Sequence, residues 1–160
     1  MNRFLTVLLA LVVEAAASGF VVAAPRPAHT AVRLERGPCE RRCAVYSVTL
    51  YGDGRVVYVG QHFVRKAGTV KTRVEPDAVR EIVQRLEALT FFDLKDSYGA
   101  DPGDCVQRGE DTPGATLTLT VDGRTKTVQH NVGCVGPVTS RLTDIAAAID
   151  RVAHTSRWIK

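Results

Sequence analysis

Alternation of apolar and polar residues predicts two β-hairpins in the chain. In the first, residues 44–51 alternate between an apolar face and a mixed face, as a half-buried strand does. Asp53-Gly54 then suits a two-residue turn with positive φ at both central positions. This register pairs Leu50 with Val57 on one face, and it places cross-strand apolar or aromatic pairs on both faces.

The second hairpin is expected over residues 115–128, ATLTLTVDGRTKTV, where apolar residues alternate with threonines before Asp122-Gly123 turns the chain. Between the hairpins, residues 69–74 (TVKTRV) read as a third, more exposed strand. The pattern therefore gives five strands, four of them in hairpins.

Helical spacing marks two further segments. Pro76 opens the first helix, at a position where its missing N–H costs nothing. The second helix is expected from Pro137 to His154, with Trp158 and Ile159 closing the chain as a short extended tail. The two apolar stripes are Val79, Ile82, Val83, Leu86 and Leu89, and then Val138, Leu142, Ile145, Ile149 and Val152.

These elements predict an α+β fold: an antiparallel sheet built from two Asp-Gly hairpins plus an extra strand, with two helices packed on one face. The polar segment from Lys95 to Gly114 interrupts the pattern and is rich in Gly, Pro and Asp. A loop of this length in a compact domain is usually functional, disordered or tied down. We therefore take Lys95 to Gly114 as the candidate binding segment.

The N-terminus predicts export. Residues 1–23 read as a signal peptide, with Arg3, an apolar run over 4–13 and small residues before cleavage after Ala17 or Ala23. Glu14 weakens this pattern, and the apolar run is too short for a membrane span of about 20 residues. Residues 24–30 would be a flexible lead-in and 31–160 a single domain. The expected location is periplasmic or secreted, with no transmembrane anchor in the mature chain.

Composition and charge indicate which classes of partner to expect. The chain of 160 residues is 45% hydrophobic and carries a formal net charge of +4, which suits one domain with a single core. The basic residues are spread out, so we expect no nucleic-acid partner, which would need a denser patch. A mild positive charge could aid contact with an acidic envelope surface.

Export changes the meaning of the four cysteines, because thiols pair in an oxidising compartment. Cys39, Cys43, Cys105 and Cys134 allow three connectivities. An extended strand would hold Cys39 and Cys43 about 13 Å apart, so the segment between them must bend or each must find a distant partner. We favour Cys39–Cys43 and Cys105–Cys134. By reducing the conformational entropy of the unfolded chain, the two closed loops would stabilise the fold by about 2 and about 3.6 kcal/mol, respectively.

Three chemical alternatives stay open beside the disulfides. The first is a catalytic dithiol of Cys39 and Cys43. Their spacing and the strand that follows do not fit the Cys-x-x-Cys redox motif, which lies at a helix N-terminus. A zinc site could use Cys39, Cys43, His130 and Cys134, although Cys105 would then be unpaired. A calcium cluster could use Asp96, Asp101, Asp104, Glu110 and Asp111, which lack the regular alternation of a calcium loop.

No catalytic motif stands out. His62 and His130 could each act as a base, but neither has a carboxylate or nucleophile at a telling spacing. Phosphate-binding glycine loops and local serine triads are absent from the sequence. The sequence thus predicts no cofactor and no catalytic residue.

The segment GPCERRCAVYSVTLYGDGRVVYVG resembles a family of exported bacterial proteins catalogued only as a domain of unknown function. That family is marked by Pro-Cys-x₃-Cys-Pro-Val-Tyr, then a strand ending Tyr-Gly-Asp-Gly and a Val-Tyr strand. The matching residues are Pro38, Cys39, Cys43, Val45, Tyr46, Tyr51, Gly52, Asp53, Gly54, Val57 and Tyr58. FFDLKDSY, LTLTVDGRTKTVQH and IDRVAHTSRWI are similar too, whereas Ala44 departs from the family's proline. The resemblance implies an exported, stand-alone α+β domain with no assigned activity.

The sequence therefore favours a non-enzymatic, disulfide-stabilised binding module for a protein or cell-envelope component. One alternative is a metal-dependent or thiol enzyme that uses Cys39 and Cys43. Another is an inhibitor of a secreted hydrolase, which belongs to the binding class.

Overall fold

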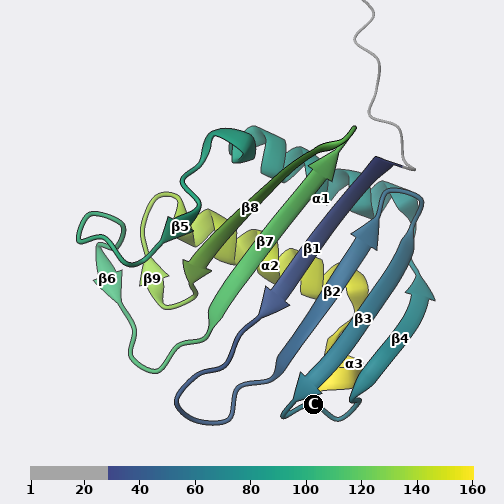
Figure 1. Cartoon of the computed structure of the whole chain (residues 1–160), viewed down its shortest axis with the longest axis horizontal. Coiled ribbons are helices and arrows are strands. Elements are labelled where there is room, and N and C mark those ends of the chain that lie inside the picture. The colour runs from purple at the N-terminus through teal and green to yellow at the C-terminus, as the bar shows by residue number, and fades with distance from the viewer. Residues whose placement is uncertain (1–28) are drawn as a thin grey trace, which may run out of the picture.

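A seven-stranded sheet in the order β4-β3-β2-β1-β7-β8-β5 forms one layer of the protein (Figure 1). The computed structural model describes residues 29–160; the predicted signal peptide and nearly all of the lead-in lie outside them. The sheet strands are β1 (Thr30–Arg36), β2 (Val45–Tyr51), β3 (Arg55–His62), β4 (Gly68–Arg73), β5 (Ser97–Tyr98), β7 (Gly114–Val121) and β8 (Arg124–Asn131). Two short strands, β6 (Gln107–Arg108) and β9 (Cys134–Val135), pair separately.

The helices form the second layer and lie behind the sheet in Figure 1. They are α1 (Pro76–Ala88), the 3₁₀ turn η2 (Phe91–Asp93), α2 (Thr139–Ala153) and the short α3 (Ser156–Ile159). No helix in this part of the chain is long and apolar enough to cross a membrane.

The core lies between the two layers, where the apolar face of the sheet meets the stripes of α1 and α2. The predicted α+β class is confirmed, and the sheet is mostly antiparallel, since only β5 runs parallel to its neighbour β8. The buried residues of this core include Val32, Leu34, Val48, Leu50, Val56, Leu117, Leu119 and Val128 from the strands, and Val79, Ile82, Leu86, Leu142, Ile145 and Ile149 from the helices.

The central strand β1 was missing from the sequence prediction, which assigned no element to residues 31–36 and so gave the sheet too few strands. β1 pairs with β2 on one side and with β7 on the other, so it joins the two hairpins into one sheet. Its Val32 and Leu34 are fully buried while Arg33 and Glu35 alternate on the other face. Two apolar residues among charges are a weak signal, and only the neighbours on both sides make this strand central.

The predicted register of the first hairpin is wrong by one residue. Leu50 pairs with Val56 rather than with Val57. The turn holds three residues instead of two, because the Gly54 amide donates to the Tyr51 carbonyl at 2.8 Å and Gly54 alone takes a positive φ, of 84°. The second hairpin has a two-residue turn, where Asp122 and Gly123 have φ of 48° and 84°.

The C-terminus also differs from the extended tail expected for it. Trp158 lies in the helical turn α3 and stacks on Tyr58, with ring centroids 4.7 Å apart. Tyr46 lies 5.6 Å from Tyr58, so the three rings form a second, aromatic cluster at this end of the sheet. Burial of the Trp158 ring against the tyrosines explains why the tail folds back.

Candidate functional site

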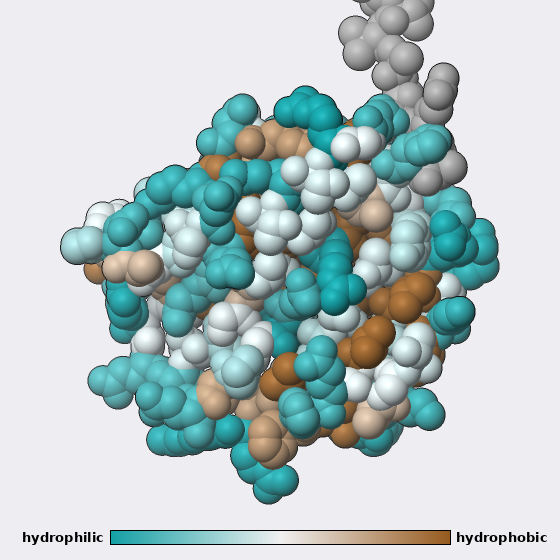
Figure 2. Space-filling model, viewed as in Figure 1, coloured by the Kyte–Doolittle hydropathy of each residue, from teal (hydrophilic) through white to brown (hydrophobic). Residues whose placement is uncertain are grey.

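A groove of about 730 Å³ lies on the face of the sheet that the helices leave uncovered. Hydroxyl and amide side chains of three strands line it, and the loop 97–100 forms a wall along one side. These are Gln61, Thr116, Thr127 and Gln129, and the lining also includes Glu35, Arg36, His130 and Asn131. Figure 2 views this face and shows pale surface over the strands, with hydrophilic side chains scattered across it and apolar side chains gathered towards the right of the view.

The composition of the open face changes across the sheet. Over β7 and β8, threonine hydroxyls pair between strands, Thr118 with Thr127 at 3.0 Å and Thr120 with Thr125 at 2.9 Å. Over the middle of β3 the outward residues are Val57 and Val59, both half-buried. The face thus offers hydrogen-bonding groups on one side and apolar contact on the other.

A row of polar residues crosses the sheet beneath α2 at the same end as the groove. His130, Ala115, Arg36 and Tyr46 are successive cross-strand partners on β8, β7, β1 and β2. His130 Nε2 lies 3.2 Å from the hydroxyl of Thr143 on α2. We call His130, Arg36 and Tyr46 the polar row.

Asp150, two helical turns beyond Thr143 on the same side of α2, accepts bonds from the rest of the row. Its carboxylate receives Arg36 Nη2 at 2.8 Å and the Tyr46 hydroxyl at 2.7 Å. The Thr155 hydroxyl donates to the same carboxylate at 2.9 Å. Arg36 and Asp150 keep only 14% and 20% of their side-chain surface exposed, so this ion pair is largely shielded from water.

The electrostatics of the row favour a structural role over acid–base chemistry. Burial, and then the charge of Asp150, raises the pKa of Tyr46 far above its usual value. Burial, and then the nearby Arg36, lowers the pKa of His130 to about 4. A general acid or base works best with a pKa near the operating pH, and neither group meets that condition near neutrality.

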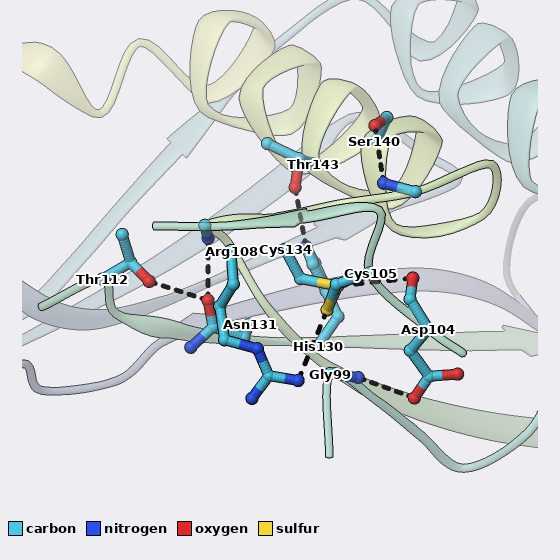
Figure 3. The surroundings of a disulfide bond; sticks show 12 residues. Gly99, Asp104, Cys105, Arg108, Thr112, His130, Asn131, Cys134, Ser140 and Thr143 are labelled. Atoms are coloured by element: carbon cyan, nitrogen blue, oxygen red, sulfur yellow. Dashed lines mark hydrogen bonds between the residues drawn. A yellow bond between two sulfur atoms is a disulfide. The ribbon is translucent and has the colours of Figure 1, made fainter. Parts of the chain in front are cut away.

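The long loop is ordered around a disulfide (Figure 3). Cys105 is bonded to Cys134, which is completely buried. The Asp104 carboxylate accepts the Gly99 amide at 2.9 Å and the Lys95 ammonium at 2.6 Å. These contacts hold the wall of the groove, residues 97–100, against the end of β8.

Both disulfides that the sequence favoured are present, Cys39–Cys43 and Cys105–Cys134. The zinc set of Cys39, Cys43, His130 and Cys134 therefore does not form in this structure, and Cys39 and Cys43 carry no thiol for a redox enzyme. His130 turns instead to Thr143.

The acidic residues of the loop are dispersed rather than gathered into a calcium site. Asp101 and Asp104 share the ammonium of Lys95, while Asp111 pairs with Arg41 at 3.3 Å. Within residues 29–160, no three His, Cys, Asp or Glu side chains come together in a way that could hold a metal ion.

Of the two histidines singled out from the sequence, only His130 borders the groove; His62 is an exposed residue at the end of β3. Sequence reasoning missed Arg36 and Asp150, which lie 114 positions apart. The signal for Arg36 was present, since it continues the Val32–Leu34 alternation as the one charge on a buried face. Nothing local marked Asp150 as its partner.

Comparison with known proteins identifies a family for this chain. A family model described as a domain of unknown function, DUF6438, matches residues 30–153. The match begins at β1 and runs to the end of α2, so it covers the groove and the polar row. Among curated proteins, none matches this chain.

Proposed function

The chain belongs to the DUF6438 family of domains of unknown function, and on that premise we propose that it is an exported, non-enzymatic binding module. It holds a segment of a protein or another cell-envelope component in the groove on the open face of the sheet. The two disulfides support the exported location, because such bonds persist in oxidising compartments.

The groove and its pinned wall carry this proposal. An antiparallel sheet commonly leaves one face to water, so an open face alone would be weak support. Here the face is hollowed to about 730 Å³ and bounded by loop 97–100, which a disulfide and the Asp104 contacts hold in place. A preformed site binds without the cost of ordering its own loops.

The chemistry of the groove favours an extended polar ligand that makes hydrogen bonds. Thr116, Thr127, Gln61 and Gln129 supply both donors and acceptors. The carboxylate and the guanidinium of the lining are already paired, Glu35 with Arg33 at 2.9 Å and Arg36 with Asp150 at 2.8 Å. A neutral polar segment, such as a peptide backbone or a glycan, suits these groups better than a strongly charged one.

Inhibition of a secreted hydrolase is a second use of a binding module, and one observation favours it. Val106 is 87% exposed beside Cys105, on a segment that the disulfide fixes. A rigid, exposed apolar side chain is what a specificity pocket of an enzyme would receive. In that case the Val106 segment, and not the groove, would carry the contact.

Capture from envelope extract by the immobilised, disulfide-bonded chain tests the groove. Thr116→Tyr places a ring in the groove, and Thr125→Tyr places the same ring on the same face outside it. We expect Thr116→Tyr to lose a specific partner by about tenfold or more, the loss of one well-placed contact, while Thr125→Tyr keeps it. Equal capture by both variants would refute the groove as the site, and loss with Val106→Asp alone would favour the inhibitor.

A further inference from the structure

Basic side chains gather around an exposed phenylalanine at one end of the molecule. Three segments meet there: the loop between β1 and β2, the turn between β3 and β4, and α3, all at the lower end of Figure 1. The Arg42 guanidinium lies 5.2 Å from the Phe63 ring centroid, and the Lys66 amide donates to the Trp158 carbonyl at 2.9 Å. We call this surface the basic end; its residues are Arg41, Arg42, Phe63, Arg65, Lys66, Arg157 and Lys160.

The backbone presents Phe63 to solvent. Phe63 has a φ of 52°, a left-handed conformation that bulky residues rarely adopt, and its side chain is 52% exposed. The next residue, Val64, packs inward on the aromatic cluster of Tyr46, Tyr58 and Trp158. Of two consecutive apolar residues, the turn therefore buries one and holds the other outside. Unusual backbone conformations of this kind are concentrated at functional positions.

The turn rests on a firm base. At Gly60 an added Cβ would come within 2.1 Å of the Lys66 carbonyl, so the two sides of the turn are in close backbone contact. The Arg65 guanidinium donates to the Arg157 carbonyl, which ties the turn to α3. Phe63 thus stands on an ordered support.

The charge of this end is strongly one-sided. Two acidic residues lie beside it: Glu40, and Asp111, which pairs with Arg41 at 3.3 Å. The other five basic side chains of the basic end form no ion pair within residues 29–160, and all five are exposed. Their field is therefore available to a partner of opposite charge.

We propose that the basic end docks on the surface of a membrane that contains anionic phospholipids. Phe63 enters the boundary between headgroups and acyl chains while the basic side chains contact lipid phosphates. The exposed ring decides between lipid and a soluble anionic polymer, because a polymer of negative charges offers it no apolar medium. This surface shares no residue with the lining of the groove and does not depend on the function proposed for it.

Co-sedimentation of the disulfide-bonded chain with lipid vesicles tests the proposal. Vesicles of phosphatidylglycerol and phosphatidylcholine in equal parts should bind the protein, and pure phosphatidylcholine should not. Phe63→Ala should weaken binding by about tenfold, the effect of removing one inserted ring. The pair Arg65→Glu and Lys66→Glu should weaken it by at least about tenfold, because each cation near the surface contributes attraction.

Control variants outside the basic end make the same kinds of change. Val106→Ala removes an apolar side chain that is 87% exposed outside the basic end, and Arg80→Glu with Arg85→Glu makes the same charge change on α1. Both controls should bind as the parent does, as should the groove variant Thr116→Tyr. Equal binding by Phe63→Ala and Val106→Ala would overturn the proposal, as would equal binding to neutral vesicles. Binding to soluble polyglutamate with the same affinity as to anionic vesicles would replace the membrane by an anionic polymer.

Discussion

At the scale of single residues, His130 makes folding depend on pH. Its side chain is almost fully buried, only Thr143 bonds its ring, and its Nδ1 has no hydrogen-bond partner within residues 29–160. The pKa of His130 is lowered from 6.5 to about 4, first by burial and then by Arg36. The folded state therefore binds fewer protons than the unfolded state between these two values.

The consequence has a definite sign. The stability that neutral His130 contributes is complete above pH 6.5 and is lost as the pH falls towards 4. We expect the native chain to lose about 3 kcal/mol more than His130→Gln across this window, since one pKa unit corresponds to about 1.4 kcal/mol. Urea unfolding at several pH values measures this difference. His62→Gln, at an exposed site, should follow the native chain; parallel curves for the native chain and His130→Gln would contradict the assignment.

At the scale of elements, Asp150 fixes α2 to the sheet. One carboxylate receives Arg36, Tyr46 and Thr155, which come from two strands and from the start of the last helical turn. Removal of one partner from a shielded ion pair leaves the other charge uncompensated, which costs more than the pair itself contributes. The orientation of α2 over the polar row depends on this one side chain.

Asp150→Ala should therefore lower the free energy of unfolding by about 2–3 kcal/mol, below the 3–5 kcal/mol of a fully buried pair because some solvent reaches this one. Asp144→Ala on the exposed side of the same helix should change it by less than about 0.5 kcal/mol. Chemical denaturation of both variants is the measurement. In an Arg36→Met background the cost of Asp150→Ala should shrink, because no buried cation is then left unpaired. Equal effects of the two alanine variants would exclude this role.

Elements also show how far sequence patterns reach. The stripe of α1 was predicted because Val79, Ile82 and Leu86 repeat at helical spacing within one segment. β1 escaped because its apolar signal is only Val32 and Leu34, and its central place comes from distant strands. The register of the first hairpin depended on whether its turn holds two residues or three, and Asp53-Gly54 is compatible with both.

The candidate site also has parts that the sequence could predict and parts that it could not. Both disulfide pairs and the tethering of the long loop could be predicted, because four cysteines that all pair have only three connectivities. The groove could not be predicted. It forms because β1 joins the two hairpins into one sheet, which places Thr116 of β7 and Gln61 of β3 on the same face. The basic end escaped because its charges are scattered along the chain and meet only when α3 folds back onto the turn at Phe63.

At the scale of the whole molecule, the two proposed surfaces can be tested independently, because different side chains form them. The groove lies over the open face and draws on hydroxyl and amide groups, whereas the basic end draws on cations and one ring. Salt should therefore distinguish them. Attraction between exposed charges is screened over about 8 Å at physiological ionic strength, while hydrogen bonds between neutral groups respond little to salt.

A crossed test uses this separation. Thr116→Tyr should lose the captured partner and keep vesicle binding, and Phe63→Ala should lose vesicle binding and keep the partner. Raising the salt concentration should release the parent chain from anionic vesicles but leave the groove complex intact, because only the first depends on unpaired surface cations. Both binding assays, run on the same preparations, measure these outcomes. If either variant lost both activities while its unfolding midpoint stayed at the parent value, the groove and the basic end would form a single binding surface, and the division drawn between them would be wrong.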